Sequence, residues 1–132
     1  MANETILVAD DDRIVVDFLT LWLREEGFNV TTAADCMQVI MSTRKTAPRA
    51  IVLNLTMPGG AGFDVLRRLG ANAAMRAVPV IAISASVDPE LPRKALESGA
   101  KAFLYKPVER DELVATVHGV LAQATRSSHQ NR

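Results

Sequence analysis

The chain has 132 residues, of which 48% are hydrophobic and 23% charged, the balance expected of one globular domain with a proper core. Basic and acidic residues number 15 each, so the charge balance gives no indication of a nucleic-acid or membrane partner. A single cysteine, Cys36, excludes an internal disulfide, and no apolar stretch approaches the roughly 20 residues of a membrane span, so we expect a cytoplasmic protein.

Short apolar runs alternate with segments of helical periodicity along the whole chain. Strands are expected near residues 5–9, 29–33, 50–54, 78–83 and 102–105. Helices are expected over about 13–26, from an N-cap at Asp35 to before Pro48, after Gly62, from an N-cap at Asp88 to Gly99, and around 113–121. The apolar residues whose spacing predicts the first three helices are Ile14, Phe18 and Leu21; Met37, Ile40 and Met41; and Phe63, Leu66 and Leu69.

This alternation predicts an α/β domain with a parallel sheet covered by helices on both faces. We place the domain at residues 1–124 and expect residues 125–132 to form a polar, flexible C-terminal tail. In such sheets, ligands bind beyond the carboxyl ends of the strands.

Polar side chains stand at those strand ends. Asp10 and Asp11 follow the first expected strand, Asn54 ends the third, Ser84 ends the fourth and Lys106 follows the fifth. Acids, a hydroxyl and a lysine in this arrangement form a set that handles a phosphoryl group and a divalent metal. The neighbouring Asp12 is expected only to cap the first helix.

These positions and their surroundings resemble a response-regulator receiver domain over about residues 4–122. The motifs that carry the resemblance are Leu7-Val8-Ala9-Asp10-Asp11-Asp12, Met57-Pro58-Gly59-Gly60-Ala61-Gly62, Ile83-Ser84-Ala85, Gly99-Ala100-Lys101-Ala102 and Lys106-Pro107. The resemblance implies a flavodoxin-like, doubly wound (βα)5 fold with strand order 2-1-3-4-5. It also implies a module of two-component phosphorelay signalling and not an enzyme.

The resemblance assigns roles to particular residues. Asp10, Asp11 and the main-chain carbonyl of Thr56 would hold Mg²⁺, a cation that prefers oxygen ligands. Lys106 and Ser84 would contact the phosphoryl group.

Two further residues have roles in transmitting or timing the signal. Phe103 would move together with Ser84 when the state changes, although a plain core role is the alternative for its ring. Ser86 matches a position that tunes phosphoryl lifetime in the family.

Asn54 departs from the family at the position of the nucleophilic carboxylate. Phosphoryl transfer requires a carboxylate oxygen there, and an amide carries no negative charge. We therefore expect a chain that does not accept phosphate, binds Mg²⁺ only weakly and acts through protein contacts. Ala61 is a second departure, since family members often carry an acid before the glycine at 62.

Three partner and function alternatives remain at this point. If position 54 is natively Asp and was changed to Asn by engineering, the partner is a sensor histidine kinase or a phosphotransfer protein. Otherwise the partner is another signalling protein, and the family's surface of fourth helix, fifth strand and fifth helix offers a site for a homodimer. The alternative from another class is a flavodoxin-like binder of flavin or nucleotide at the same strand ends.

Overall fold

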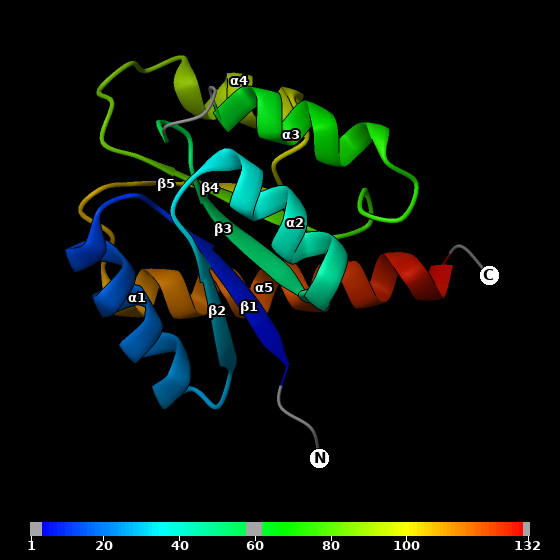
Figure 1. The fold of residues 1–132 in the computed structure, drawn as a ribbon, viewed down its shortest axis with the longest axis horizontal. Helices are drawn as coiled ribbons and strands as arrows, with labels where there is room; N and C mark the ends of the chain where they lie inside the picture. The colour runs from blue at the N-terminus through cyan, green and yellow to red at the C-terminus, as the bar shows by residue number, and fades with distance from the viewer. Residues whose placement is uncertain (1–3, 58–61, 131–132) are drawn as a thin grey trace.

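The structure is a computed structural model that describes residues 4–57 and 62–130, with side chains described as far as residue 125. The described residues form strands and helices in strict alternation (Figure 1). The strands are β1 (Thr5–Ala9), β2 (Asn29–Ala33), β3 (Ala50–Asn54), β4 (Val80–Ser84) and β5 (Ala102–Tyr105). The helices are α1 (Arg13–Glu25), α2 (Cys36–Thr46), α3 (Gly62–Ala71), α4 (Leu91–Glu97) and α5 (Arg110–Gln130).

The strands form one parallel sheet in the order β2-β1-β3-β4-β5, which confirms the predicted flavodoxin-like topology. β1 and β3 lie side by side at the centre, with Ala9 opposite Leu53 in the register. Because all the strands run the same way, their carboxyl ends meet at one edge of the sheet. The residues that follow β1, β3, β4 and β5 therefore lie near one another.

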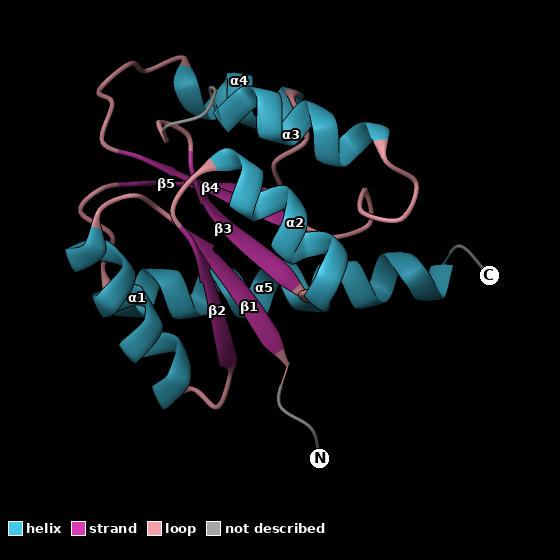
Figure 2. Cartoon of the chain, in the orientation of Figure 1, coloured by secondary structure: helices cyan, strands magenta, loops and turns pink. Residues whose placement is uncertain are grey.

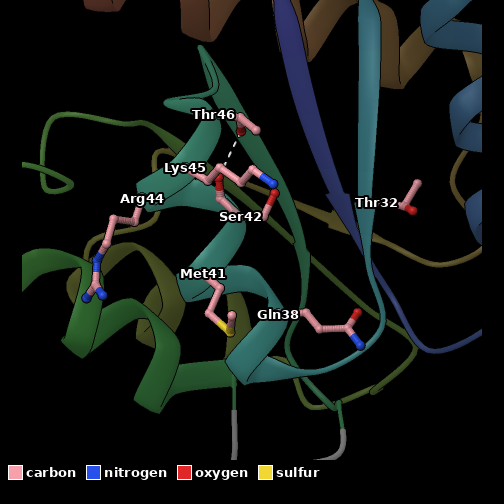
Figure 3. Close-up of a pocket in the computed structure, with 7 residues that line it drawn as sticks. All are labelled: Thr32, Gln38, Met41, Ser42, Arg44, Lys45 and Thr46. Carbon is pink, nitrogen blue, oxygen red and sulfur yellow. Dashed lines mark hydrogen bonds between the residues drawn. The ribbon is translucent and has the colours of Figure 1, made fainter.

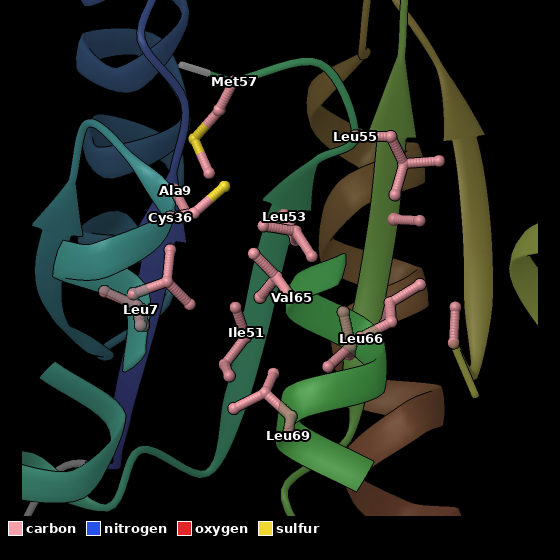
Figure 4. Packing of buried hydrophobic residues seen from close by; sticks show 14 of the residues in the cluster. Leu7, Ala9, Cys36, Ile51, Leu53, Leu55, Met57, Val65, Leu66 and Leu69 are labelled. Atoms are coloured by element: carbon pink, nitrogen blue, oxygen red, sulfur yellow. The ribbon is translucent and has the colours of Figure 1, made fainter. Parts of the chain in front are cut away.

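Helices cover both faces of the sheet (Figure 2). Alternate residues of each strand point to opposite faces, so Ile6 and Val8 join a core with α1 and α5, whereas Leu7 and Ala9 join a core with α2, α3 and α4. Figure 4 shows the second core, in which side chains of β1 and β3 pack against α2 and α3.

Caps end several helices where the sequence predicts them. The Asp12 side chain accepts hydrogen bonds from the N–H groups of Ile14 and Val15, and Asp35 caps α2 in the same way. Gly27 and Gly99 follow α1 and α4 with φ of 93° and 114°, a backbone region that favours glycine.

The apolar stripe that predicts α1 faces solvent and not the core. Ile14 is 68% exposed and Phe18 52% exposed, whereas Leu19 and Leu23 are buried. The spacing therefore predicts the helix correctly but not the face that it buries. The physical reason is that α1 carries further apolar residues beside this stripe, including Leu19 and Leu23, so the spacing identifies a helix without selecting the face that the sheet covers.

Helix α2 forms where the spacing predicts it, and its stripe is also only partly buried. Ile40 is buried, but Met37 and Met41 are 56% and 61% exposed. Val39 and Cys36, which the spacing did not select, are buried in their place. In α3, by contrast, Leu66 and Leu69 are buried and Phe63 packs against the core.

Helix α4 begins later than expected. Asp88 does not cap it; its side chain accepts a hydrogen bond from the N–H of Glu90, within the turn that precedes the helix at Leu91. An Asp side chain stabilises such a turn as readily as a helix start, which explains the error.

Helix α5 continues to Gln130, through most of the segment expected to be a flexible tail. Ala122, Gln123 and Ala124 favour helix, and Thr125 Oγ1 donates a hydrogen bond to the carbonyl of Leu121. Helical propensity therefore extends α5 beyond its apolar stripe. Among the described residues, no helix is long and apolar enough to cross a membrane.

Gly62 allows α3 to start directly against the end of β3. A Cβ atom at this position would overlap the backbone of Leu55, and the Gly62 N–H donates to the Leu55 carbonyl at 2.8 Å. Only glycine permits this approach. The contact holds the chain that follows Asn54 in place.

Candidate functional site

The acidic residues after β1 take different places. Asp10 is 2% exposed, and its Oδ1 accepts a hydrogen bond from the Asp12 N–H at 2.9 Å. Asp11 is exposed. One carboxylate is therefore fixed inside the domain while its neighbour lies at the solvent edge of the site.

Asn54 lies at the end of β3 and is 2% exposed. Its Nδ2 is 3.2 Å from Asp10 Oδ1, 3.3 Å from Asp11 Oδ1 and 3.3 Å from the Thr56 carbonyl. Its Oδ1 accepts from the Thr56 N–H at 3.3 Å and from Thr56 Oγ1 at 3.2 Å. The main-chain N–H can only donate and the carboxylates can only accept, so these partners fix which way the amide points.

Lys106 neutralises the buried carboxylate. Its Nζ lies 2.7 Å from Asp10 Oδ2, with side-chain exposures of 16% for Lys106 and 0% for Asp10. Lys106 follows β5 and is held against the end of β4, because its N–H donates to the Ser84 carbonyl at 2.8 Å. The Lys106–Pro107 peptide is cis. An ion pair at this depth is screened little by solvent, and Asp10 depends on it for its charge balance.

Ser84 and Phe103 lie on the neighbouring strands and have other contacts. Ser84 is fully buried, and its Oγ accepts a hydrogen bond from the Ser86 N–H at 3.0 Å. Phe103 packs against the core of α2, α3 and α4, and its ring meets Tyr105 edge-on at a centroid distance of 4.9 Å. The predicted set thus divides into a connected cluster and two flanking residues.

We call the connected cluster the amide site: Asp10, Asp11, Asn54, Thr56 and Lys106. Asp10, Asp11, Asn54 and Lys106 were predicted from their places at or just after strand ends, and the Thr56 carbonyl from the family resemblance. The side chain of Thr56 was missed, since only its carbonyl had an expected role; its hydroxyl holds the amide of Asn54. Ala61 lies outside the described residues.

A hollow lies along α2 (Figure 3). Its volume is about 620 Å³. Its lining is Thr32, Gln38, Met41, Ser42, Arg44, Lys45 and Thr46, with no member of the amide site. Because no amide-site residue lines this hollow, we do not take it as the functional site.

A family model for the response regulator receiver domain matches residues 6–118. The DNA-binding response regulator MtrA of Mycolicibacterium paratuberculosis is 37% identical over 119 residues, which cover 90% of this chain and 52% of MtrA. The chain therefore spans about half the length of this relative.

Solved structures agree with the family match. A putative response regulator from Chloroflexus aurantiacus has a TM-score of 0.87 and 30% identity, covering 92% of this chain and 99% of its own. A Francisella response regulator receiver domain has a TM-score of 0.85 and 30% identity, covering 92% and 98%. These matches favour a receiver over a flavin or nucleotide binder. Since the fold, the strand-end residues and the matches agree over most of its length, the chain belongs to the response regulator receiver domain family.

Proposed function

We propose that this chain is a cytoplasmic receiver domain that transmits a signal by protein contact without accepting a phosphoryl group at Asn54. Receiver domains are signalling modules that interact with histidine kinases or phosphotransfer proteins. The proposal for this chain departs from that scheme only in that no phosphoryl group is transferred to position 54.

The observation that carries the proposal is the state of the Asn54 side chain. It stands where the family resemblance places the nucleophilic carboxylate, and its Oδ1 is already engaged by Thr56 N–H and Oγ1. An amide oxygen is a poor nucleophile because its electrons are delocalised and it carries no charge. A phosphodonor that reached this site would find no group able to attack it.

Receiver domains generally bind Mg²⁺ at their acidic pocket. Asp10, Asp11 and the Thr56 carbonyl are the oxygen donors that such a cation would use here. With an amide in place of a third carboxylate, we expect weaker Mg²⁺ binding than in a receiver with Asp at this position.

Exposed apolar side chains support a role in protein contact. Ile14, Phe18 and Leu21 are each more than half exposed along the outer face of α1. Contiguous apolar surface of this kind is uncommon on a monomer and typically marks an interaction site.

The surface formed by α4, β5 and α5 is the proposed homodimer interface. Leu96 and Tyr105 are exposed there, at 49% and 44%. Sedimentation velocity at increasing concentration should show a dimer that Leu96→Glu combined with Tyr105→Glu abolishes. A chain that stays monomeric at every concentration would remove the homodimer from the proposal and leave the other partners.

The test of the proposal is incubation with acetyl phosphate and Mg²⁺, followed by intact-mass measurement. We expect no mass gain for the chain and the gain of one phosphoryl group for Asn54→Asp. A phosphoryl adduct on the chain itself would overturn the proposal.

The alternative is a phospho-accepting response regulator in which Asp was replaced by Asn at position 54. It predicts that Asn54→Asp, with its fold intact by circular dichroism, accepts phosphate from a histidine kinase. A restored chain that stays unmodified by both kinase and acetyl phosphate would rule this alternative out.

A further inference from the structure

We infer that the amide nitrogen of Asn54 takes the place of the divalent cation, so that the amide site is assembled without metal. This inference goes beyond the proposed function, because it concerns what holds the site together and stands whether or not the chain accepts phosphate.

The geometry around Nδ2 is that of a cation site with a different occupant. Asp10 Oδ1, Asp11 Oδ1 and the Thr56 carbonyl oxygen all lie 3.2–3.3 Å from this one nitrogen. These are the three oxygens that the resemblance assigns to Mg²⁺. The NH2 group carries partial positive charge on two hydrogens, which the three acceptors share.

A cation cannot be added to this arrangement without displacing the amide. Mg²⁺ requires its oxygen ligands at about 2.0–2.1 Å in near-octahedral geometry. The nitrogen already lies in contact with the same three oxygens, so the cation and the NH2 group exclude each other. The residues present therefore do not fit the metal as they are arranged.

Rotating the amide does not solve this problem at low cost. A flip would turn Oδ1 towards two carboxylates and Nδ2 towards the Thr56 N–H, which places like partners together. All the hydrogen bonds that fix the present orientation would be lost. Asn54 is 2% exposed, so water does not replace them readily.

The amide at position 54 also leaves less negative charge for a cation to neutralise than an Asp would. Asp10 and Asp11 contribute −2 and Lys106 +1, which leaves a formal charge of −1 in the amide site. Asp10 is already paired with Lys106, and Asp11 is exposed to water.

The decisive variant is Asn54→Ala, which removes the amide and keeps both carboxylates. If Asn54 were only a weak ligand, its removal would weaken cation binding further. If its nitrogen occupies the cation's place, removal should strengthen binding. The two ideas therefore predict opposite changes from one substitution.

The probe is Mn²⁺, which favours octahedral oxygen sites and whose free fraction is measured by electron paramagnetic resonance. We expect the chain to bind Mn²⁺ at least about tenfold more weakly than Asn54→Ala and Asn54→Asp do. Asp11→Ala added to Asn54→Asp should reduce binding again, which places the ion at this site.

Two results would overturn the inference. One is Mn²⁺ binding by the unmodified chain as tight as by Asn54→Ala, and the other is the absence of binding by all of the variants. If circular dichroism shows that Asn54→Ala is unfolded, Asn54→Ser takes its place, since it also removes the NH2 group. A phosphoryl adduct on the unmodified chain would overturn the proposed function alone, whereas Mn²⁺ binding by that chain as tight as by Asn54→Ala would overturn this inference alone.

Discussion

Replacing Asn54 by Asp should destabilise the metal-free fold, because it exchanges a donor for a charge in contact with two carboxylates. The present amide donates to Asp10 Oδ1 and Asp11 Oδ1 at 3.2 and 3.3 Å. Hydrogen bonds to charged acceptors contribute about 1.5–3 kcal/mol each at ordinary length, and less at these longer distances. In Asn54→Asp both bonds are lost.

The new negative charge also repels the carboxylates of Asp10 and Asp11, and this repulsion is larger than the loss of the two hydrogen bonds. Two unit charges 3.2 Å apart repel by about 5 kcal/mol at an effective dielectric constant of about 20. Lys106 attracts the added carboxylate, and the exposed Asp11 can turn towards water, so both reduce this figure. We expect a net loss of about 3 kcal/mol in the free energy of unfolding at pH 7 in EDTA.

Urea denaturation followed by the fluorescence of Trp22, the only tryptophan, measures this difference. The matched control is Asn72→Asp, the same chemical change in the turn after α3. There the side-chain oxygen only accepts from the Ala74 N–H at 2.8 Å, which a carboxylate does equally well. The control should stay within about 0.5 kcal/mol of the original chain. If the free energy of unfolding of Asn54→Asp in EDTA is also within about 0.5 kcal/mol of that of the original chain, the amide does not hold the two carboxylates.

Three further predictions concern a close backbone contact, the buried ion pair and the buried cysteine. Gly62→Ala should lower the free energy of unfolding, measured in urea, by about 3 kcal/mol, because its Cβ would overlap the backbone of Leu55. Gly70→Ala is the control: it has open space around it and should be neutral or stabilising. Equal effects of the two substitutions would contradict the close approach of Gly62 to Leu55. Lys106→Met should cost about 3 kcal/mol at pH 7, since it leaves the Asp10 carboxylate buried without its partner, and a neutral result would show that the ion pair is not needed. Burial raises the pKa of the Cys36 thiol, so its alkylation at pH 8 should be slow in the folded chain and fast in urea; equal rates would show that the thiol is accessible in the native fold.

Local chemistry made much of the fold predictable from the sequence. The caps at Asp12 and Asp35 and the glycines at 27 and 99 depend on side-chain and backbone preferences of a few neighbouring residues. The strand order followed from a resemblance carried by several separated motifs. These predictions needed no knowledge of which helix packs where.

The members of the amide site were predictable for a topological reason. In a parallel sheet the carboxyl ends of neighbouring strands meet, so Asp10, Asn54 and Lys106 were expected together before any distance was known. The roles of residues further along the same loops, such as Thr56, were harder to predict from the sequence. The hydroxyl of Thr56 was missed because no pattern distinguishes a threonine that holds a side chain from one in contact with water.

Packing decided which faces of the helices are buried. Phe18 and Met41 belong to regular apolar stripes, yet both lie in solvent, because the sheet covers the opposite faces of α1 and α2. A helical period identifies a stripe but contains no information on where the sheet lies when more than one stripe is apolar. The late start of α4 and the length of α5 likewise depended on competition between local structures of similar free energy.

The sequence by itself determined that an amide stands among the acids and the lysine at the strand ends of a receiver fold. Only the tertiary structure decided what that amide does. Its nitrogen faces Asp10, Asp11 and the Thr56 carbonyl because three oxygen acceptors from two strand ends converge on one point, while the Thr56 donors hold its oxygen on the other side. The orientation of a side chain is set by all of its partners at once, and those partners come together only when the sheet has formed.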